Sequence, residues 1–164
     1  MRRTCLLALA LLLAACGGDD DSTGSSPILP GAYRGTLTLT VAAGPATTSQ
    51  GGPITIRVTP DQVVAAGNFP PVPAQGSSFT SSLPAAALDS VTLTCPQGTF
   101  GLEGTFRGTT VSGTPFGAGI VCNGFPAAVT GAFAASLQTE TRQGRRDADV
   151  LHLFRETILR ALSR

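Results

Sequence analysis

The stretch YRGTLTLTV, residues 33–41, alternates between apolar and polar side chains. The apolar residues of one parity are Tyr33, Leu37, Leu39 and Val41, and the polar residues of the other parity are Arg34, Thr36, Thr38 and Thr40. Successive side chains of a strand point to opposite faces of its sheet, so this pattern predicts a strand with one buried face. The same alternation identifies the other strands of the domain.

The same alternation recurs as far as residue 137, and further strands are expected in 53–58, 62–67, 89–95, 99–108, 114–122 and 127–137. The side chains expected to point inward are Ile54, Ile56, Val58, Val91, Leu93, Cys95, Phe100, Leu102, Phe106, Phe116, Ala118, Ile120, Cys122, Val129, Phe133 and Leu137. Glycines inside the strands suggest bulges or strong coiling. The pattern predicts a mainly β domain over residues 31–137, an antiparallel small barrel or β-sandwich of about six to eight strands.

A proline-rich stretch, GNFPPVPAQGSS at residues 67–78, interrupts this pattern. Its prolines favour an extended conformation, and we expect a stiff connecting loop. Phe69 is the one residue of this loop that could anchor a partner.

The composition changes at about Gln138, where the threonine alternation stops and arginines accumulate. Residues 138–164 are interpreted as a polar linker and an amphipathic helix that begins with Asp147 as its N-cap. The apolar face holds Val150, Leu151, Phe154, Ile158, Ala161 and Leu162, and the polar face holds His152, Glu156, Arg160 and Ser163. The 147–164 helix could pack against an open end of the β-domain, bind an envelope partner or an anionic membrane surface, or be disordered.

The start of the chain has a basic end, a short apolar run from Thr4 to Leu13, and the small residues Ala14 and Ala15. A membrane-spanning helix needs roughly 20 apolar residues, so residues 1–15 are expected to be a cleaved secretory signal peptide. Leu13-Ala14-Ala15-Cys16 resembles the lipobox of bacterial lipoproteins. That resemblance implies lipidation of Cys16, which becomes the first mature residue and anchors the protein through its acyl chains. The other interpretation is an ordinary secretory signal with an incidental cysteine.

Residues 16–30 are expected to form a flexible tether between the anchor and the domain. Gly17 directly follows Cys16. By resemblance to bacterial lipoproteins, a glycine at this position implies sorting to the outer membrane, and the inner membrane is the alternative. The run Asp19 to Asp21 resembles the acidic signals that send some lipoproteins to the cell surface, but a solvated acidic tether is the simpler interpretation.

The other cysteines have distinct expected fates. Cys5 leaves with the leader, whereas Cys95 and Cys122 remain as a pair in an exported protein, where disulfides form. Both fall on the apolar parity of their expected strands, so we predict that they form a disulfide. Its loop of about 28 residues would stabilise the domain by roughly 3–4 kcal/mol.

Functional groups are sparse. From Cys16 onward the chain has nine arginines against ten acidic residues and no lysine, so no nucleic-acid partner is expected. His152 is the single histidine, and the acids between residues 31 and 137 are Asp61, Asp89 and Glu103. The two aspartates suit turns, and Glu103 is expected to pair across strands with Arg107 or Arg57. We expect no enzyme, cofactor or metal, although a carboxylate pair of Asp89 with Glu103 is not excluded by spacing.

The sequence therefore predicts a lipid-anchored cell-envelope protein with a non-catalytic binding or structural β-domain. The alternative is a small barrel that carries an apolar ligand among Phe100, Phe106, Phe116 and Phe133. An envelope hydrolase is a third possibility and would need converging acids, or His152 beside a hydroxyl.

Overall fold

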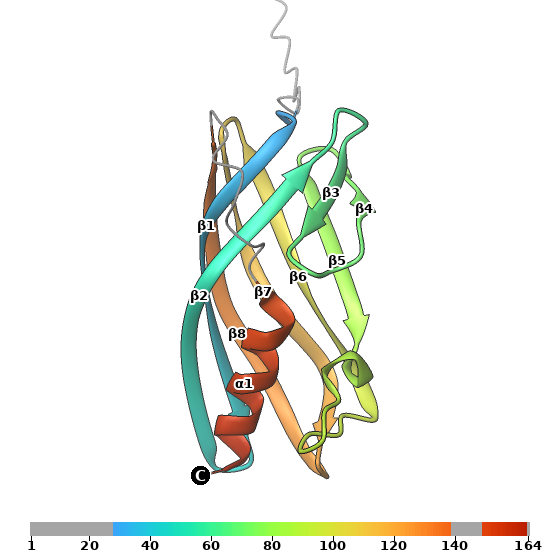
Figure 1. Cartoon of the computed structure of the whole chain (residues 1–164), viewed down its shortest axis with the longest axis vertical. Coiled ribbons are helices and arrows are strands. Elements are labelled where there is room, and N and C mark those ends of the chain that lie inside the picture. Colours follow the sequence, from blue (N-terminus) through green and yellow to red (C-terminus); the bar gives the residue numbers. More distant parts are fainter. Residues whose placement is uncertain (1–27, 139–148, 164) are drawn as a thin grey trace, which may run out of the picture.

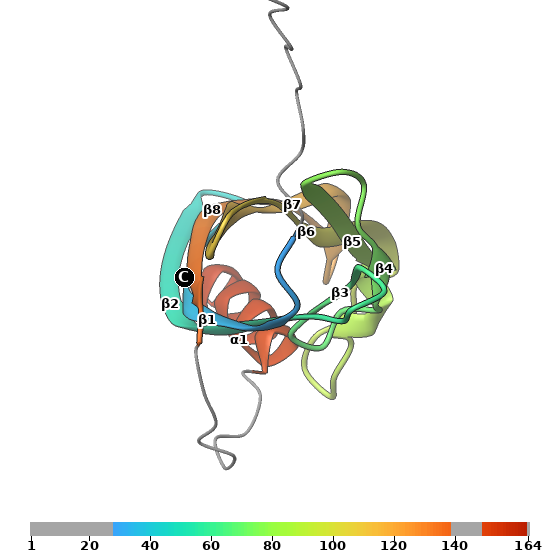
Figure 2. The same ribbon diagram turned by 90° about the horizontal axis from the view of Figure 1, so that it is seen from above.

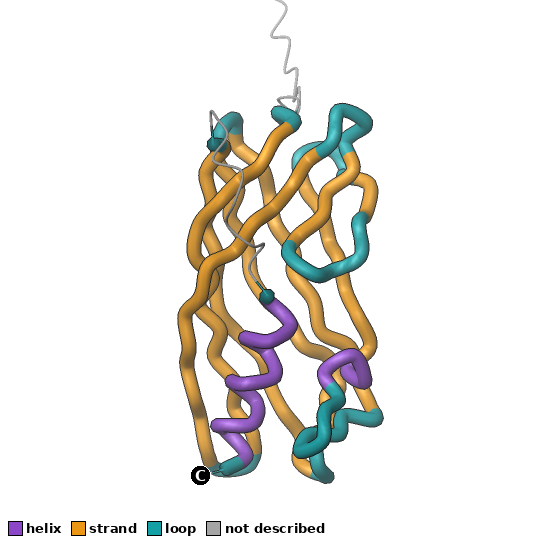
Figure 3. The backbone as a smooth tube through the Cα atoms, in the orientation of Figure 1, coloured by secondary structure: helices purple, strands orange, loops and turns teal. Residues whose placement is uncertain are grey.

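A computed structural model describes residues 28–138 and 149–163, and the predicted signal peptide, lipidated cysteine and most of the tether lie outside these residues. One antiparallel sheet of eight strands, in the order β4-β3-β2-β1-β8-β7-β6-β5, curls into a nearly closed barrel (Figures 1 and 3). The elements are β1 (Gly31–Ala43), β2 (Ala46–Val58), β3 (Val63–Ala66), β4 (Val72–Pro73), β5 (Ser78–Pro84), the 3₁₀ helix η1 (Ala85–Leu88), β6 (Gln97–Arg107), β7 (Thr110–Cys122), β8 (Phe125–Leu137) and α1 (Val150–Leu162). The prediction of a small barrel with a C-terminal helix is confirmed, and the sandwich alternative is wrong because all the strands belong to one sheet.

The barrel wall has a gap between the two ends of the sheet. β3 pairs with β2 only at Ile56, Arg57 and Val58, so the lower half of β2 has no strand beyond it. α1 packs against β1, β2 and η1 along this gap, and Figure 2 shows most of the helix within the outline of the ring of strands. The helix thus completes the wall, which agrees with the packing interpretation of the sequence, although it covers an open side and not an open end.

The opening stretch forms the middle of β1, as predicted. Tyr33, Leu37, Leu39 and Val41 are buried. Leu37 lies opposite Phe133 of β8 in the register of the sheet. β1 is the central strand that joins the β2 and β8 sides of the wall, because both neighbours pair with it along most of its length.

The side chains of β7 change face at a bulge. Thr99 pairs with Ala118 but Gln97 pairs with Val121, so β7 has one extra residue near Gly119, which has a left-handed φ of 62°. An extra residue reverses the alternation. The prediction that Phe116 and Ala118 point inward with Ile120 and Cys122 is therefore wrong: Ile120 and Cys122 are buried, whereas Ala118 is exposed and Phe116 half-buried.

Residues 89–95 form a loop, which corrects the strand predicted there. Asp89 accepts a hydrogen bond from the backbone N–H of Cys95 at 2.6 Å. The side chain of Asn123 accepts from Thr94 N–H at 2.8 Å and donates to the Thr92 carbonyl at 3.1 Å. These bonds replace a strand ladder, and they leave Val91 fully exposed while Leu93 and Cys95 are buried.

The proline-rich stretch contains the short β4, and β5 follows it as a strand that the sequence analysis missed. Phe69 is 3% exposed, so its expected role as an exposed anchor is wrong. Its ring lies 5.5 Å from that of Phe100 and 6.1 Å from that of Phe154, between centroids. The loop therefore contributes a large side chain to the core.

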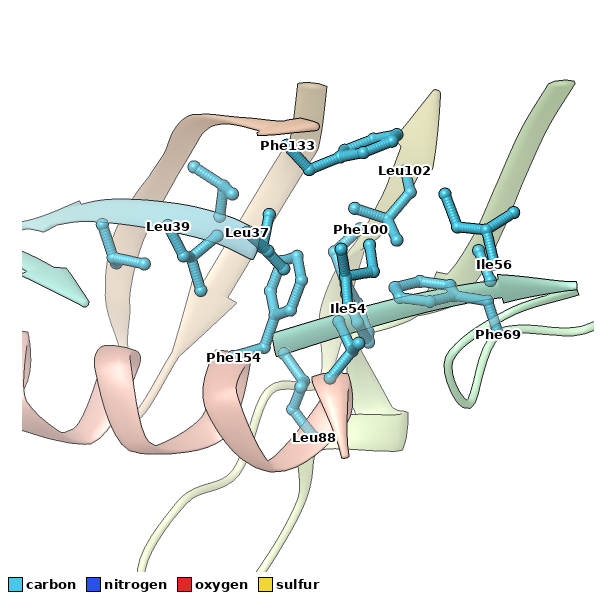
Figure 4. Packing of buried hydrophobic residues seen from close by; sticks show 14 of the residues in the cluster. Leu37, Leu39, Ile54, Ile56, Phe69, Leu88, Phe100, Leu102, Phe133 and Phe154 are labelled. Carbon is cyan, nitrogen blue, oxygen red and sulfur yellow. The ribbon is translucent and has the colours of Figure 1, made fainter. Parts of the chain in front are cut away.

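Side chains from the strands, the 67–78 loop, η1 and α1 form one core (Figure 4). Aromatic rings connect its parts: Tyr33 contacts Phe106, Phe106 contacts Phe79, and Phe79 contacts Phe133. Residues ahead of β1 also join the domain, because Ile28 is buried and Tyr33 Oη donates to the Leu29 carbonyl at 2.9 Å.

α1 begins one residue after Asp149, whose carboxylate accepts a hydrogen bond from His152 N–H at 2.9 Å. The N-cap is therefore Asp149, and the prediction of Asp147 is wrong; Asp147 itself lies outside the described residues. Val150, Phe154, Ile158 and Ala161 are buried on the predicted apolar face. None of the helices within 28–138 and 149–163 has the length and apolar character needed to span a bilayer.

Candidate functional site

A groove lies between β2 and α1 at the gap in the barrel wall. It has a volume of about 350 Å³ and is lined by Gln50, Gly51, Gly52, Pro53, Asp149, His152, Leu153, Glu156 and Arg160. Gly52 sets the closeness of the two elements, because a Cβ atom at this position would lie 3.2 Å from Leu153 Cδ2. Gly52 therefore permits the close approach of β2 and α1 that forms this side of the groove.

β2 borders the groove with an open strand edge. The Thr55 carbonyl accepts a hydrogen bond from Gly67 N–H at 2.9 Å, so the backbone groups of Thr55 point away from β1. Backbone direction alternates along a strand, and the β1–β2 register runs without a shift. The backbone groups of Thr47, Ser49, Gly51 and Pro53 consequently point away from β1 as well, where none of the described strands pairs with them.

Two polar side chains of β2 that point toward the interior have no hydrogen-bond partner within the described ranges. They are the buried atoms Gln50 Nε2 and Thr48 Oγ1. A buried donor without an acceptor costs about 1–3 kcal/mol. Gln50 Nε2 is enclosed by the chain's own atoms, so it adds a cost to the fold beside the groove and is not a contact point on the groove surface.

The helical wall of the groove carries both signs of charge. His152, Glu156 and Arg160 follow one another at four-residue spacing on the polar face predicted from the sequence, and Asp149 lies at its start. No serine, threonine or cysteine lines the groove beside His152. The arrangement can form hydrogen bonds and ion pairs with a partner.

The acids considered for catalysis have structural partners elsewhere. Asp89 binds the backbone of the 89–96 loop. Glu103 lies on the exposed face of β6 and accepts a hydrogen bond from Thr114 Oγ1 at 3.1 Å across to β7. The predicted cross-strand contact of Glu103 thus involves a threonine. In the part of the chain that the structure describes, no group of three or more histidine, cysteine or acidic residues is placed to hold a metal ion.

The four phenylalanines considered for carrying an apolar ligand do not share a site. Phe100, Phe106 and Phe133 are buried in the core, where they pack against other rings. Phe116 lies on the outer face, and its ring comes within 2.6 Å of a Cβ atom built at Gly101. The small barrel fold is consistent with either a binding or a carrier domain.

The predicted disulfide is present. Cys95 and Cys122 are joined with their Cα atoms 4.1 Å apart, and both are buried. The bond ties the 89–96 loop to the end of β7, beside the hydrogen bonds of Asn123. The two cysteines are inward-facing as expected, although only Cys122 belongs to a strand.

Comparison with known proteins identified no relative: no family model, no curated protein and no solved structure matches this chain. The sequence analysis noted the polar face of α1 but missed the role of β2 in the groove. A signal was present in QGGP at residues 50–53, because proline within a strand marks an edge whose N–H is not needed.

Proposed function

We propose that this protein is a lipid-anchored protein of the bacterial cell envelope, and that its barrel has a non-catalytic binding or structural role. The acyl chains on Cys16 would hold it to the outer membrane, with the inner membrane as the alternative address. The lipobox resemblance of Leu13 to Cys16 supports the anchor. The Cys95–Cys122 disulfide supports export, since such bonds persist mainly in oxidising compartments.

The observation that carries the binding role is the open edge of β2 beside the charged face of α1. A sheet edge without a neighbour is a template for pairing with another chain. The groove offers backbone groups and ion-pairing side chains, which together suit a polypeptide partner. The apolar face of the C-terminal helix packs in the core. A membrane or a partner would therefore contact this helix through its polar face.

Metabolic labelling with a palmitate analogue tests the anchor. We expect label on the wild type and none on Cys16→Ser, whereas Cys5→Ser, which changes the other leader-region cysteine, keeps its label. Density separation of the membranes then assigns the labelled protein to the outer or inner fraction. Equal labelling of wild type and Cys16→Ser would contradict the lipoprotein assignment.

Site-specific crosslinking in the native envelope tests the binding role. A photoreactive residue at His152, which is exposed in the groove, is compared with one at Thr130, which is exposed on β8. We expect crosslinked protein adducts from position 152 and only background from position 130. Equal yields from both positions would remove the groove as the binding surface.

A further inference from the structure

We infer that the groove is an interface with a second copy of this chain, in which two β2 edges pair antiparallel about a two-fold axis at Gln50. The inference deepens the proposed binding or structural role and rests on it, but it does not depend on the lipid anchor. Three independent features of the β2–α1 region are self-complementary about this one axis.

The first feature is the hydrogen-bonding pattern of the edge. An axis at Gln50 places Ser49 opposite the partner's Gly51 and Thr47 opposite the partner's Pro53. The N–H groups of Thr47, Ser49 and Gly51 then meet the carbonyls of the partner's Pro53, the partner's Gly51 and the partner's Ser49. Pro53 falls at the outer end of the paired segment, where its missing N–H leaves a single carbonyl unpaired on each side.

The second feature is the uncharged residue at the axis. Because the edge-bonding positions are the odd-numbered residues, Gln50 and the partner's Gln50 face each other as a non-hydrogen-bonded pair. Such pairs bring Cα atoms to about 4.5 Å and side chains closest together. Gln50 carries no charge, so the two copies meet at the axis without like-charge repulsion.

The third feature is the charge order along α1. The helix runs opposite to β2 (Figure 1), and Leu153 meets Gly52. A helix rises about 1.5 Å per residue and a strand about 3.3 Å, so Glu156 and Arg160 lie on either side of the level of Gln50. The two-fold axis therefore brings Glu156 to the partner's Arg160 and Arg160 to the partner's Glu156.

These features select a second copy over an unrelated peptide. Glu156 and Arg160 line the groove, and the structure joins neither charged head group to another described side chain. An isologous contact requires that one patch complement itself, and the acid–base order of α1 and the antiparallel edge of β2 both meet this requirement. The edge segment from Thr47 to Pro53 is uncharged and exposed at its odd-numbered positions, so it has no charged residue that would repel an identical strand.

Sedimentation equilibrium of the full chain in density-matched detergent measures the number of copies. We expect twice the single-copy mass for the wild type and for Gly51→Ala, because a Cβ atom at position 51 would have Leu37 O at 3.8 Å as its nearest neighbour. Gly51→Pro removes an edge N–H and is expected to give single copies. A single-copy mass for the wild type, or a dimeric Gly51→Pro, would overturn the inference.

A charge exchange on α1 tests the register independently of backbone effects. Glu156→Arg and Arg160→Glu each place like charges across the axis, so each is expected to weaken dimerisation at least tenfold at low salt. The double variant Glu156→Arg/Arg160→Glu restores opposite charges and is expected to recover the wild-type dissociation constant. Failure of the double variant to recover, with single variants that fold as judged by their thermal unfolding, would exclude this axis.

Crosslinking at position 152 and the sedimentation mass together distinguish a dimer of this chain from a complex with another protein. Adducts at position 152 that consist of the protein itself agree with the dimer. Adducts with a different protein, together with a single-copy mass, would keep the binding role and reject the second copy. Background yields at position 152 with a single-copy mass would reject both.

Discussion

The ring of Phe154 on α1 lies 4.9 Å from the ring of Phe100 on β6, between centroids, and both side chains are fully buried. The helix that fills the gap and a strand of the barrel wall therefore share one core. The C-terminal helix is a structural part of the barrel, since Phe154 occupies space that the sheet alone leaves open.

Replacement of Phe154 by alanine is expected to lower the free energy of unfolding by about 3–5 kcal/mol, the usual cost of removing a buried phenyl ring. His152→Ala, on the exposed face of the same helix, should change it by no more than about 0.5 kcal/mol. Denaturant-induced unfolding of both variants provides the comparison. Similar small effects from both would mean that α1 does not unfold together with the barrel.

Loss of the disulfide is expected to destabilise the domain by about 3–4 kcal/mol, from the loop-closure entropy of its 27-residue separation. The double variant Cys95→Ala/Cys122→Ala measures this cost in denaturant. A reductant should lower the stability of the wild type and leave that of the double variant unchanged. Two free thiols at these positions in the oxidised wild type, found by mass mapping, would disprove the bridge.

Burial raises the pKa of the Tyr33 phenol above its ordinary value of 10.0. The folded state favours the neutral phenol, so its contribution to stability is complete below pH 10.0 and is lost as the pH rises through the folded-state pKa. Tyr33 is the single tyrosine of the chain and there is no tryptophan, so phenolate absorbance reports it directly.

For this titration we expect a midpoint above 10.0 in the folded protein and a normal one in denaturant. Tyr33→Phe should be less stable by about 1 kcal/mol at neutral pH because it loses the hydrogen bond, and its alkaline loss of stability should be smaller. A normal midpoint in the folded protein would show that the phenol is hydrated.

Gly35→Ala is expected to destabilise the barrel by about 1–3 kcal/mol or more. A Cβ atom at this position would overlap the Ala134 carbonyl oxygen and lie 2.6 Å from Ala135 Cα, both backbone atoms of β8. Gly51→Ala on β2 meets no such contact, so it should be neutral or stabilise by up to about 1 kcal/mol. Thermal unfolding of the two variants distinguishes a packing requirement from a general effect of glycine in strands.

The spacing of apolar residues in the sequence correctly predicted the elements in which buried and exposed side chains follow a regular period. β1 and β8 show every predicted inward residue on the core side, and α1 buries the predicted apolar face. β5 was missed because Ser81 occupies an inward position, where its hydroxyl donates to the Pro70 carbonyl at 2.7 Å. This hydrogen bond satisfies a polar side chain in the core. Its acceptor lies 11 residues earlier in the chain, so the alternation around Ser81 does not reveal it.

The sequence determined the mainly β class, the pairing of Cys95 with Cys122 and the amphipathic character of α1, because alternation and helical periodicity depend only on neighbouring residues. The tertiary structure decided the rest. The bulge near Gly119 reversed the parity of β7, the hydrogen bonds of Asn123 held 89–95 as a loop, and the gap beside β2 received α1. Each of these outcomes depends on the register and closure of the sheet, which join residues far apart in the chain. The groove at Gln50 exists only where that closure leaves the β2 edge open.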